Sequence, residues 1–256
     1  MELNFKSFGS GPALIILHGL FGSLDNWQGL AKQYAERFSV FIVDQRNHGK
    51  SPHTDTPFTY GQLADDLREF MGQQGIPAAH LIGHSMGGKT VMQFAVEHEH
   101  MVERMVVADM GIAANDFRHT AIIDALSAFP FDEIKDRRVA DEWLAVRIPD
   151  FGTRQFLLKN LDRTKDGGFE WKFNLKVLHR DYQNILEGIS SPYSIDVPTL
   201  FVRGGNSDYV LDADWPGIQE VFPNSSLETI AGAGHWVHAE APGEFFERTM
   251  RFLINS

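Results

Sequence analysis

The chain has 256 residues, of which 43% are hydrophobic and 12% aromatic, so it can bury a sizeable core and disorder is not indicated. Its 23 Lys and Arg against 34 Asp and Glu give a formal net charge of −11. That charge argues against nucleic acid and anionic membrane surfaces as partners, because both require a positive patch. The absence of cysteine excludes disulfides and thiolate metal sites, and it fits a cytoplasmic protein.

The N-terminus shows no basic start followed by an apolar segment, so no secretory signal is visible. The longest apolar run, at residues 13–17, is too short to span a bilayer. We therefore expect a cytoplasmic protein with no membrane contact and a small-molecule partner. The sequence indicates no oligomeric state.

Short apolar runs alternate with helical periodicity over much of the chain. Continuous runs at 13–17, 40–43, 78–82 and 105–108 are typical of strands buried on both faces. Helices are expected between them, one of which is opened by a capping box of Thr59 and Gln62. Further strands at 199–202 and 226–230 and a last helix beginning at Pro242 complete the pattern. This alternation predicts an α/β protein with a doubly wound, mostly parallel sheet.

Residues 111–194 interrupt the alternation. They contain helical stretches at 119–129, 139–148, 156–161 and 175–189 but no run that resembles a buried strand. An interruption of this length predicts a helical cap inserted at the carboxyl ends of the strands, where ligands of such sheets bind. We therefore expect a core formed by residues 1–110 and 195–256, with a cap formed by residues 111–194.

A turn that could carry a nucleophile lies at Gly83-His84-Ser85-Met86-Gly87, between the run at 78–82 and a helix beginning near residue 90. A serine on so abrupt a strand-to-helix turn needs very small neighbours two residues before and after it. The turn also places Ser85 at a helix N-terminus, which favours developing negative charge. The sequence therefore predicts Ser85 as the nucleophile.

A serine hydroxyl needs a base within hydrogen-bond reach, and a carboxylate must orient that base. His235 follows the last predicted strand, and glycines at 232 and 234 let the backbone bend there, so it is the expected base. Two carboxylates are candidates for the acid. Asp208 follows the strand at 199–202 and is favoured, while Asp109 follows the strand at 105–108 and remains the alternative.

An oxyanion hole requires two backbone donors near the nucleophile. The N–H of Met86 is one candidate, and the N–H of Leu20, in the loop after the first buried strand, is the other. We expect Phe21, Trp236 and His238 to contribute to a substrate pocket around these groups. No metal site and no cofactor are expected.

Five motifs together resemble the α/β-hydrolase family: HGLFG at 18–22, DQRNHGKS at 44–51, GHSMGG at 83–88, GGNSDYV at 204–210 and GAGHWVHAE at 232–240. The first, fourth and fifth are similar to those of the YbfF-type esterases, small bacterial enzymes that cleave short acyl esters and thioesters. The resemblance implies Ser85 as nucleophile and His235 as base. It also keeps Asp109 open as the acid and places Ser207 close to the histidine, as a further candidate pocket residue. Asn47 departs from the family pattern, which commonly has glycine there.

The leading hypothesis is a serine hydrolase that cleaves a small carboxylic ester or thioester through an acyl-enzyme. The alternative is a C–C bond hydrolase or lyase that resembles the meta-cleavage-product hydrolases and uses the same triad. A binding protein that kept the fold without catalysis would be expected to lack a triad residue, and a candidate for each role is present. Dehalogenase and epoxide hydrolase chemistry is disfavoured, because those relatives have aspartate where Ser85 stands.

Overall fold

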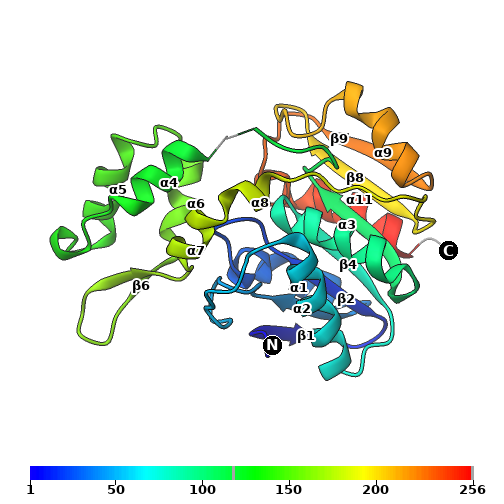
Figure 1. The fold of residues 1–256 in the computed structure, drawn as a ribbon, viewed down its shortest axis with the longest axis horizontal. Helices are drawn as coiled ribbons and strands as arrows, with labels where there is room; N and C mark the ends of the chain where they lie inside the picture. The colour runs from blue at the N-terminus through cyan, green and yellow to red at the C-terminus, as the bar shows by residue number, and fades with distance from the viewer. Residues whose placement is uncertain (117–118, 255–256) are drawn as a thin grey trace.

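The computed structural model describes residues 1–116 and 119–254. Its main sheet has seven strands in the order β1-β3-β2-β4-β5-β8-β9, and only the edge strand β1 runs antiparallel to its neighbour. The expectation of a mostly parallel, doubly wound sheet is confirmed (Figure 1). The strands are β1 Phe5–Phe8, β2 Ala13–Leu17, β3 Ser39–Val43, β4 Ala79–His84, β5 Val102–Ala108, β8 Thr199–Gly204 and β9 Ser225–Ile230.

Apolar clusters cover the sheet on both faces. Along β2, Leu14 and Ile16 belong to one cluster and Ile15 and Leu17 to the other, because successive strand residues point to opposite faces. Burial on both faces is why these strands are continuous apolar runs. One face packs against α2 Tyr60–Gln73, α3 Met86–His98 and α9 Trp215–Val221, and the other against α1 Gln28–Tyr34, α10 Val237–Glu240 and α11 Pro242–Ile254.

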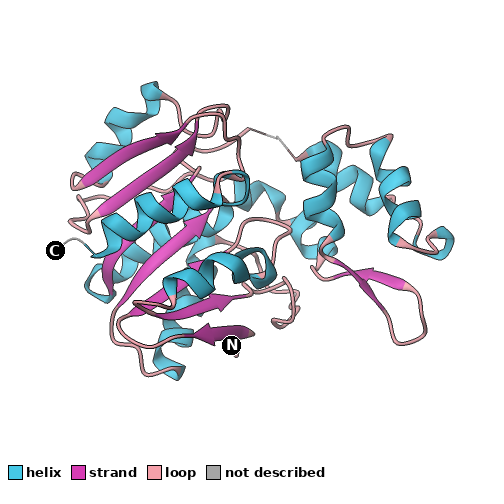
Figure 2. Ribbon diagram, turned by 180° about the vertical axis from the view of Figure 1, so that it is seen from behind, coloured by secondary structure: helices cyan, strands magenta, loops and turns pink. Residues whose placement is uncertain are grey.

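Between β5 and β8 the chain leaves the sheet and forms a largely separate group of elements, seen at the left of Figure 1 and the right of Figure 2. Helices lie near all four expected stretches, but the one expected at 156–161 spans 151–158, and the one expected at 175–189 is divided into two helices that end at residue 186. A two-stranded hairpin that the sequence did not predict begins at Leu161, within the expected 156–161 stretch. Each strand of this hairpin has only three residues, too few for a visible alternation. The elements are α4 Thr120–Ser127, α5 Arg137–Ala145, α6 Phe151–Leu158, β6 Leu161–Arg163, β7 Phe169–Trp171, α7 Leu175–Arg180 and α8 Tyr182–Leu186.

Apolar residues of these elements continue the cluster on the α2 and α3 face of the sheet. Short 3-10 turns complete the described chain at Leu24–Trp27, Glu99–Met101, Phe131–Glu133 and Asp212–Asp214. The limits of the cap, 111–194, remain a prediction, and residues 117–118 within it lie outside the described residues. Among the helices of residues 1–116 and 119–254, none combines the length and apolar character of a transmembrane span.

Candidate active site

Ser85 occupies a strained turn between β4 and α3. Its φ of 53° and ψ of −118° lie outside the regions that side chains allow easily, so the surrounding structure must hold it there. A Cβ on Gly83 would lie 2.1 Å from the carbonyl oxygen of Gly87, and one on Gly87 would lie 2.5 Å from that of Leu17. Only glycine fits at either position, and this is the physical reason for the glycine pattern around the serine.

His235, in the loop between β9 and α10, lies between Ser85 and Asp109. Its Nε2 is 3.0 Å from Ser85 Oγ, and its Nδ1 is 2.8 Å from Asp109 Oδ2. With the Nδ1 proton donated to the carboxylate, Nε2 is left as an acceptor for the serine hydroxyl. The ring of Tyr209 stacks on the imidazole with the centroids 3.9 Å apart. Ser85, His235 and Asp109 therefore form one continuous hydrogen-bonded line.

The structure places Asp109 at the imidazole, where the sequence favoured Asp208. Asp109 is fully buried at the end of β5 with a φ of 50°, and its Oδ1 accepts the Gly204 N–H at 2.9 Å. After β8 the chain turns, with the Ser207 N–H donating to the Gly204 carbonyl at 3.1 Å, and the Ser207 hydroxyl donates to Asp109 Oδ2. Asp208 is exposed in that turn. The turn after β8 thus directs Ser207 toward the Asp109 carboxylate, while Asp208 is exposed.

The loop after β2 is held by two buried imidazoles. His48 Nε2 accepts the N–H of Phe21 at 3.2 Å, and His18 Nε2 accepts the N–H of Gln45 at 3.0 Å. Burial lowers the pKa of His18 to about 4 and that of His48 to about 3, so both rings are neutral. Phe21 has a φ of 60°, and the hydrogen bond that its N–H donates to His48 fixes this strained backbone beside Leu20. Sequence reasoning missed these supporting histidines, because a buried histidine has no distinctive spacing.

His84 and His238 lie behind the proposed base. His84 Nε2 donates to the His235 carbonyl at 2.9 Å, and burial holds the pKa of the His84 imidazole well below its usual range. The ring of His238 packs 4.5 Å from that of His84 and stacks on Trp27 at 4.2 Å. His238 is only 4% exposed. It therefore supports the loop of His235, and it also lines a groove beside His235 and Trp236, so its expected place in a substrate pocket stays a prediction.

Asn47, the departure from the family pattern, has a φ of 62°, a left-handed conformation that glycine adopts freely and asparagine tolerates. Its side-chain oxygen accepts the Thr54 N–H at 2.8 Å and the Asn174 side-chain amide at 3.1 Å. The backbone N–H of Asn174 also donates to the Asn47 carbonyl at 2.8 Å. The asparagine therefore keeps the turn of the loop and ties the loop to the segment before α7.

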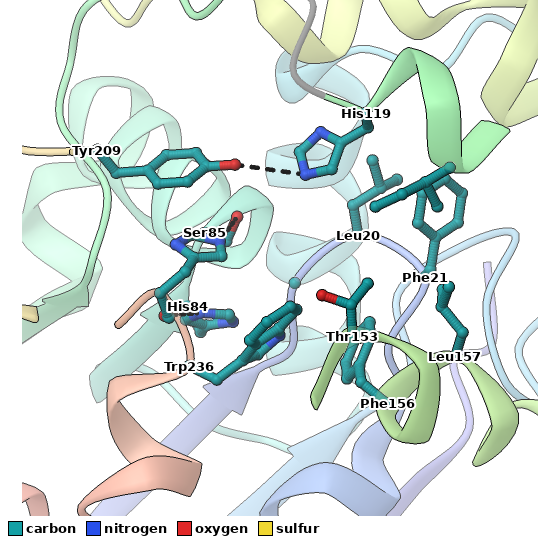
Figure 3. Close-up of a pocket in the computed structure, with 13 residues that line it drawn as sticks. Leu20, Phe21, His84, Ser85, His119, Thr153, Phe156, Leu157, Tyr209 and Trp236 are labelled. Carbon is teal, nitrogen blue, oxygen red and sulfur yellow. Dashed lines mark hydrogen bonds between the residues drawn. The ribbon is translucent and has the colours of Figure 1, made fainter. Parts of the chain in front are cut away.

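A cavity of about 240 Å³ opens over Ser85 and His235 (Figure 3). Phe21 and Trp236, two of the expected pocket residues, line it. His238 lines an adjoining groove that shares His235 and Trp236 with the cavity, and Ser207 lines neither space. Both oxyanion candidates lie near the serine, since Leu20 and Met86 line a small space that continues from the cavity past Ser85. The segment between β5 and β8 supplies five further residues of the wall that sequence reasoning did not identify: His119, Ile122, Thr153, Phe156 and Leu157.

Comparison with known proteins identifies the family to which this fold belongs. The model of the alpha/beta hydrolase fold family matches residues 12–145. Esterase YbfF of Escherichia coli is 38% identical over 94% of this chain and 92% of its own. The sn-1-specific diacylglycerol lipase ABHD11 of Xenopus laevis is 38% identical over 95% of this chain and 80% of its own. A solved structure described as a marine microorganism esterase superposes with a TM-score of 0.95 at 42% identity, covering 98% of this chain and 99% of that one.

The fold, the strained serine turn and these matches define the class: the chain belongs to the α/β-hydrolase family. Within it, the chain is a hydrolase of the esterase and lipase group, to which these relatives belong by name. The alternative of C–C bond hydrolysis is not favoured by these relatives.

Proposed function

We propose that the protein hydrolyses small carboxylic esters through an acyl-enzyme on Ser85, with His235 as the base and Asp109 as the carboxylate that orients it. The observation that carries this proposal is the line of contacts from Ser85 Oγ to His235 Nε2 at 3.0 Å and from His235 Nδ1 to Asp109 at 2.8 Å. Each partner lies within the reach that proton transfer requires.

In the first half of the reaction Ser85 Oγ attacks the ester carbonyl while its proton passes to His235 Nε2. The carboxylate of Asp109 stabilises the imidazolium that forms. The N–H groups of Leu20 and Met86 are assigned to the oxyanion of the tetrahedral intermediate, where loss of one such donor costs about 3 kcal/mol. His235 then protonates the leaving oxygen, and the acyl group remains on Ser85.

In the second half a water molecule takes the place of the alcohol. His235 Nε2 accepts a proton from that water as it attacks the acyl-enzyme, and Ser85 leaves with the proton returned to it. The same steps would cleave a thioester, with a thiol as the leaving group, so thioesterase activity belongs to the proposal. The Gly204 N–H and the Ser207 hydroxyl donate to the Asp109 carboxylate and hold it in place beside His235.

The test is a series of p-nitrophenyl and coenzyme A esters of increasing acyl length, assayed with the wild type and with Ser85→Ala. We expect a burst of p-nitrophenol equal to the enzyme concentration in the wild type and loss of both burst and turnover in the variant. If Ser85→Ala kept the turnover of the wild type, Ser85 would not be the nucleophile. Turnover only of a C–C bond substrate would move the protein to the alternative class, and no turnover of any substrate by the wild type would favour a binding role.

A further inference from the structure

Two further spaces continue from the cavity, one past Ser85 and one past His235. The space past Ser85 shares Leu20, Ser85, His119 and Tyr209 with the cavity. The space past His235 shares His235 and Trp236 with it, together with Thr153 and Phe156 of α6. Ser85 and His235 therefore each line a different one of the two spaces that adjoin the cavity.

The space past Ser85, here called the serine-side pocket, is small and mostly apolar. Its volume is about 20 Å³, which is room for roughly one water-sized group. The buried residues Tyr60, Met110 and Ile185 line it, and Asn115 and the exposed Asp116 add polar groups to its wall. The Tyr60 hydroxyl donates to the Ile185 carbonyl at 2.8 Å, which fixes one wall against α8. A pocket so narrow and so held accepts a short apolar chain.

The space past His235, here called the histidine-side groove, is far larger and open, at about 670 Å³. Its carboxylates already accept local hydrogen bonds: Asp150 from the N–H and hydroxyl of Thr153 at 2.7 Å each, and Glu240 from the N–H of Gly234 at 2.8 Å. Lys159, which is exposed, also lines the groove. The groove thus presents polar groups to a ligand that extends toward solvent.

An aromatic pair separates cavity and groove. The rings of Phe156 and Trp236 lie 5.5 Å apart, and both residues line both spaces (Figure 3). Anything that passes from the serine into the groove therefore runs along these two rings. They make a flat apolar contact for the part of a leaving group closest to the ester bond.

The chemistry of the proposed reaction gives the two spaces different occupants. The leaving oxygen or sulfur must take its proton from His235 Nε2, so the leaving group lies on the histidine side, whereas the acyl carbon stays bonded to Ser85. We infer that the serine-side pocket holds the acyl chain and the histidine-side groove holds the leaving group, which selects short acyl esters of an extended polar alcohol or thiol. This inference rests on the proposed function and adds the direction in which a substrate binds.

The acyl half is tested with p-nitrophenyl acetate, butyrate and octanoate. The wild type is expected to have the highest kcat/KM for acetate, and Ile185→Ala to raise the butyrate-to-acetate ratio of kcat/KM about tenfold, since each methylene in an apolar pocket changes selection by that order. Ile189→Ala is the matched control, because Ile189 is 4% exposed in the following segment and does not line the pocket. Ile185→Val, with a milder change in the same direction, replaces Ile185→Ala if that variant does not fold.

The leaving-group half is tested with two acetyl compounds, p-nitrophenyl acetate and acetyl-coenzyme A. Phe156→Ala is expected to raise KM for acetyl-coenzyme A about tenfold, as loss of an apolar contact does, while the butyrate-to-acetate ratio of kcat/KM stays at the wild-type value. Phe151→Ala is the control, because this residue is on the same helix, 64% exposed and outside the groove lining.

Three results separate the possibilities. If Phe156→Ala changes the acyl ratio and Ile185→Ala does not, the inferred direction is reversed. If Leu157→Ala, rather than Ile185→Ala, raises the butyrate-to-acetate ratio of kcat/KM, the acyl group of the substrate occupies the central cavity and the inference is overturned. If the wild type hydrolyses none of these compounds, the proposed function itself has failed, and this outcome differs from both of the others.

Discussion

Contacts on several sides restrict the orientation of His235. Ser85 and Asp109 engage its two ring nitrogens, Tyr209 covers one face of the ring, and His84 donates to its carbonyl. A ring restrained in this way presents Nε2 to the serine without losing side-chain entropy at the moment of reaction. Replacement of a single contact is therefore expected to act mainly on kcat.

The first prediction concerns the carboxylate. Asp109→Asn removes the negative charge and the preference for the Nδ1–H tautomer, and we expect kcat for p-nitrophenyl acetate to fall by about 10⁴-fold. The kcat of Asp208→Asn, at the exposed position after Ser207, is expected to stay within a few-fold of the wild-type value. Steady-state kinetics of the two purified variants checks this, and the opposite ranking would assign the role to Asp208.

A second prediction separates backbone from side chain at Asn47. Asn47→Gly keeps the left-handed turn and the backbone bond to Asn174, and removes the hydrogen bonds that the Asn47 side-chain oxygen accepts from Thr54 and Asn174. Asn47→Ala loses the same bonds and also places a Cβ in the left-handed region, at a further cost of about 1–2 kcal/mol. Urea unfolding should therefore rank the proteins wild type, Asn47→Gly and Asn47→Ala in falling stability. Equal stability of the two variants would show that the turn is unstrained.

At the scale of the elements, β4, the serine turn and α3 form a unit that tolerates no side chain at its glycines. We predict that Gly83→Ala prevents folding or abolishes activity, because its Cβ would overlap the Gly87 carbonyl. Gly72→Ala is the control: it is exposed in α2, no atom lies within 4 Å of the added Cβ, and alanine is favoured over glycine in a helix by about 0.5–1 kcal/mol. Thermal unfolding and ester hydrolysis of both variants test this prediction. An active and stable Gly83→Ala variant would contradict the packing argument.

What the sequence could predict is what local patterns encode. The alternation of buried runs and helices predicts where β2, β3, β4, β5, β8 and β9 lie along the chain. Thr59 does cap α2 by accepting the N–H of Gln62, but the Gln62 side chain accepts from Arg46 and does not close the predicted capping box. The glycines around Ser85 likewise indicate the serine turn from the sequence alone. The antiparallel strand β1 and the hairpin of β6 and β7 escaped prediction because they have four and three residues, too short for a periodic signal.

The rest of the site depends on contacts between distant segments. β5 and β8 are neighbours that end at the same edge of the sheet, so chain order could not choose between Asp109 and Asp208. The choice lies in the turn after β8, which directs Ser207 toward Asp109. The cavity wall contributed by α4 and α6 was equally hidden, since it depends on how those helices sit over the sheet.

For the molecule as a whole, the buried neutral histidines predict sensitivity to acid. Burial lowers the folded-state pKa of His18 to about 4 and of His48 and His238 to about 3, against about 6.5 in the unfolded chain. The unfolded chain therefore binds more protons than the folded protein between these values, and stability falls as pH falls from 6.5 toward 4. Each such histidine contributes a loss of about 1.4 kcal/mol per pH unit within that window.

The measurement is the urea midpoint at pH 7.5, 6 and 5 for the wild type and for His48→Gln, whose amide can both donate to the Arg46 carbonyl and accept from the Phe21 N–H, as the imidazole does. The variant is expected to lose less stability than the wild type between pH 6 and pH 5. Equal losses would mean that the imidazole of His48 is protonated in the folded protein as readily as in water.

The chain departs from the sheet after β5 and comes back at β8, and these two strands are hydrogen-bonded partners from Met105 paired with Thr199 to Ala108 paired with Val202. The chain leaves β5 at the carboxyl edge of the sheet and enters β8 at the opposite edge, and the N–H of Ile189, which donates to the Ile112 carbonyl at 2.8 Å, holds the two ends of the intervening segment together. The corresponding segment of a related protein could accordingly replace the one between β5 and β8. Such chimeras would share one reaction centre and differ in which molecules reach it.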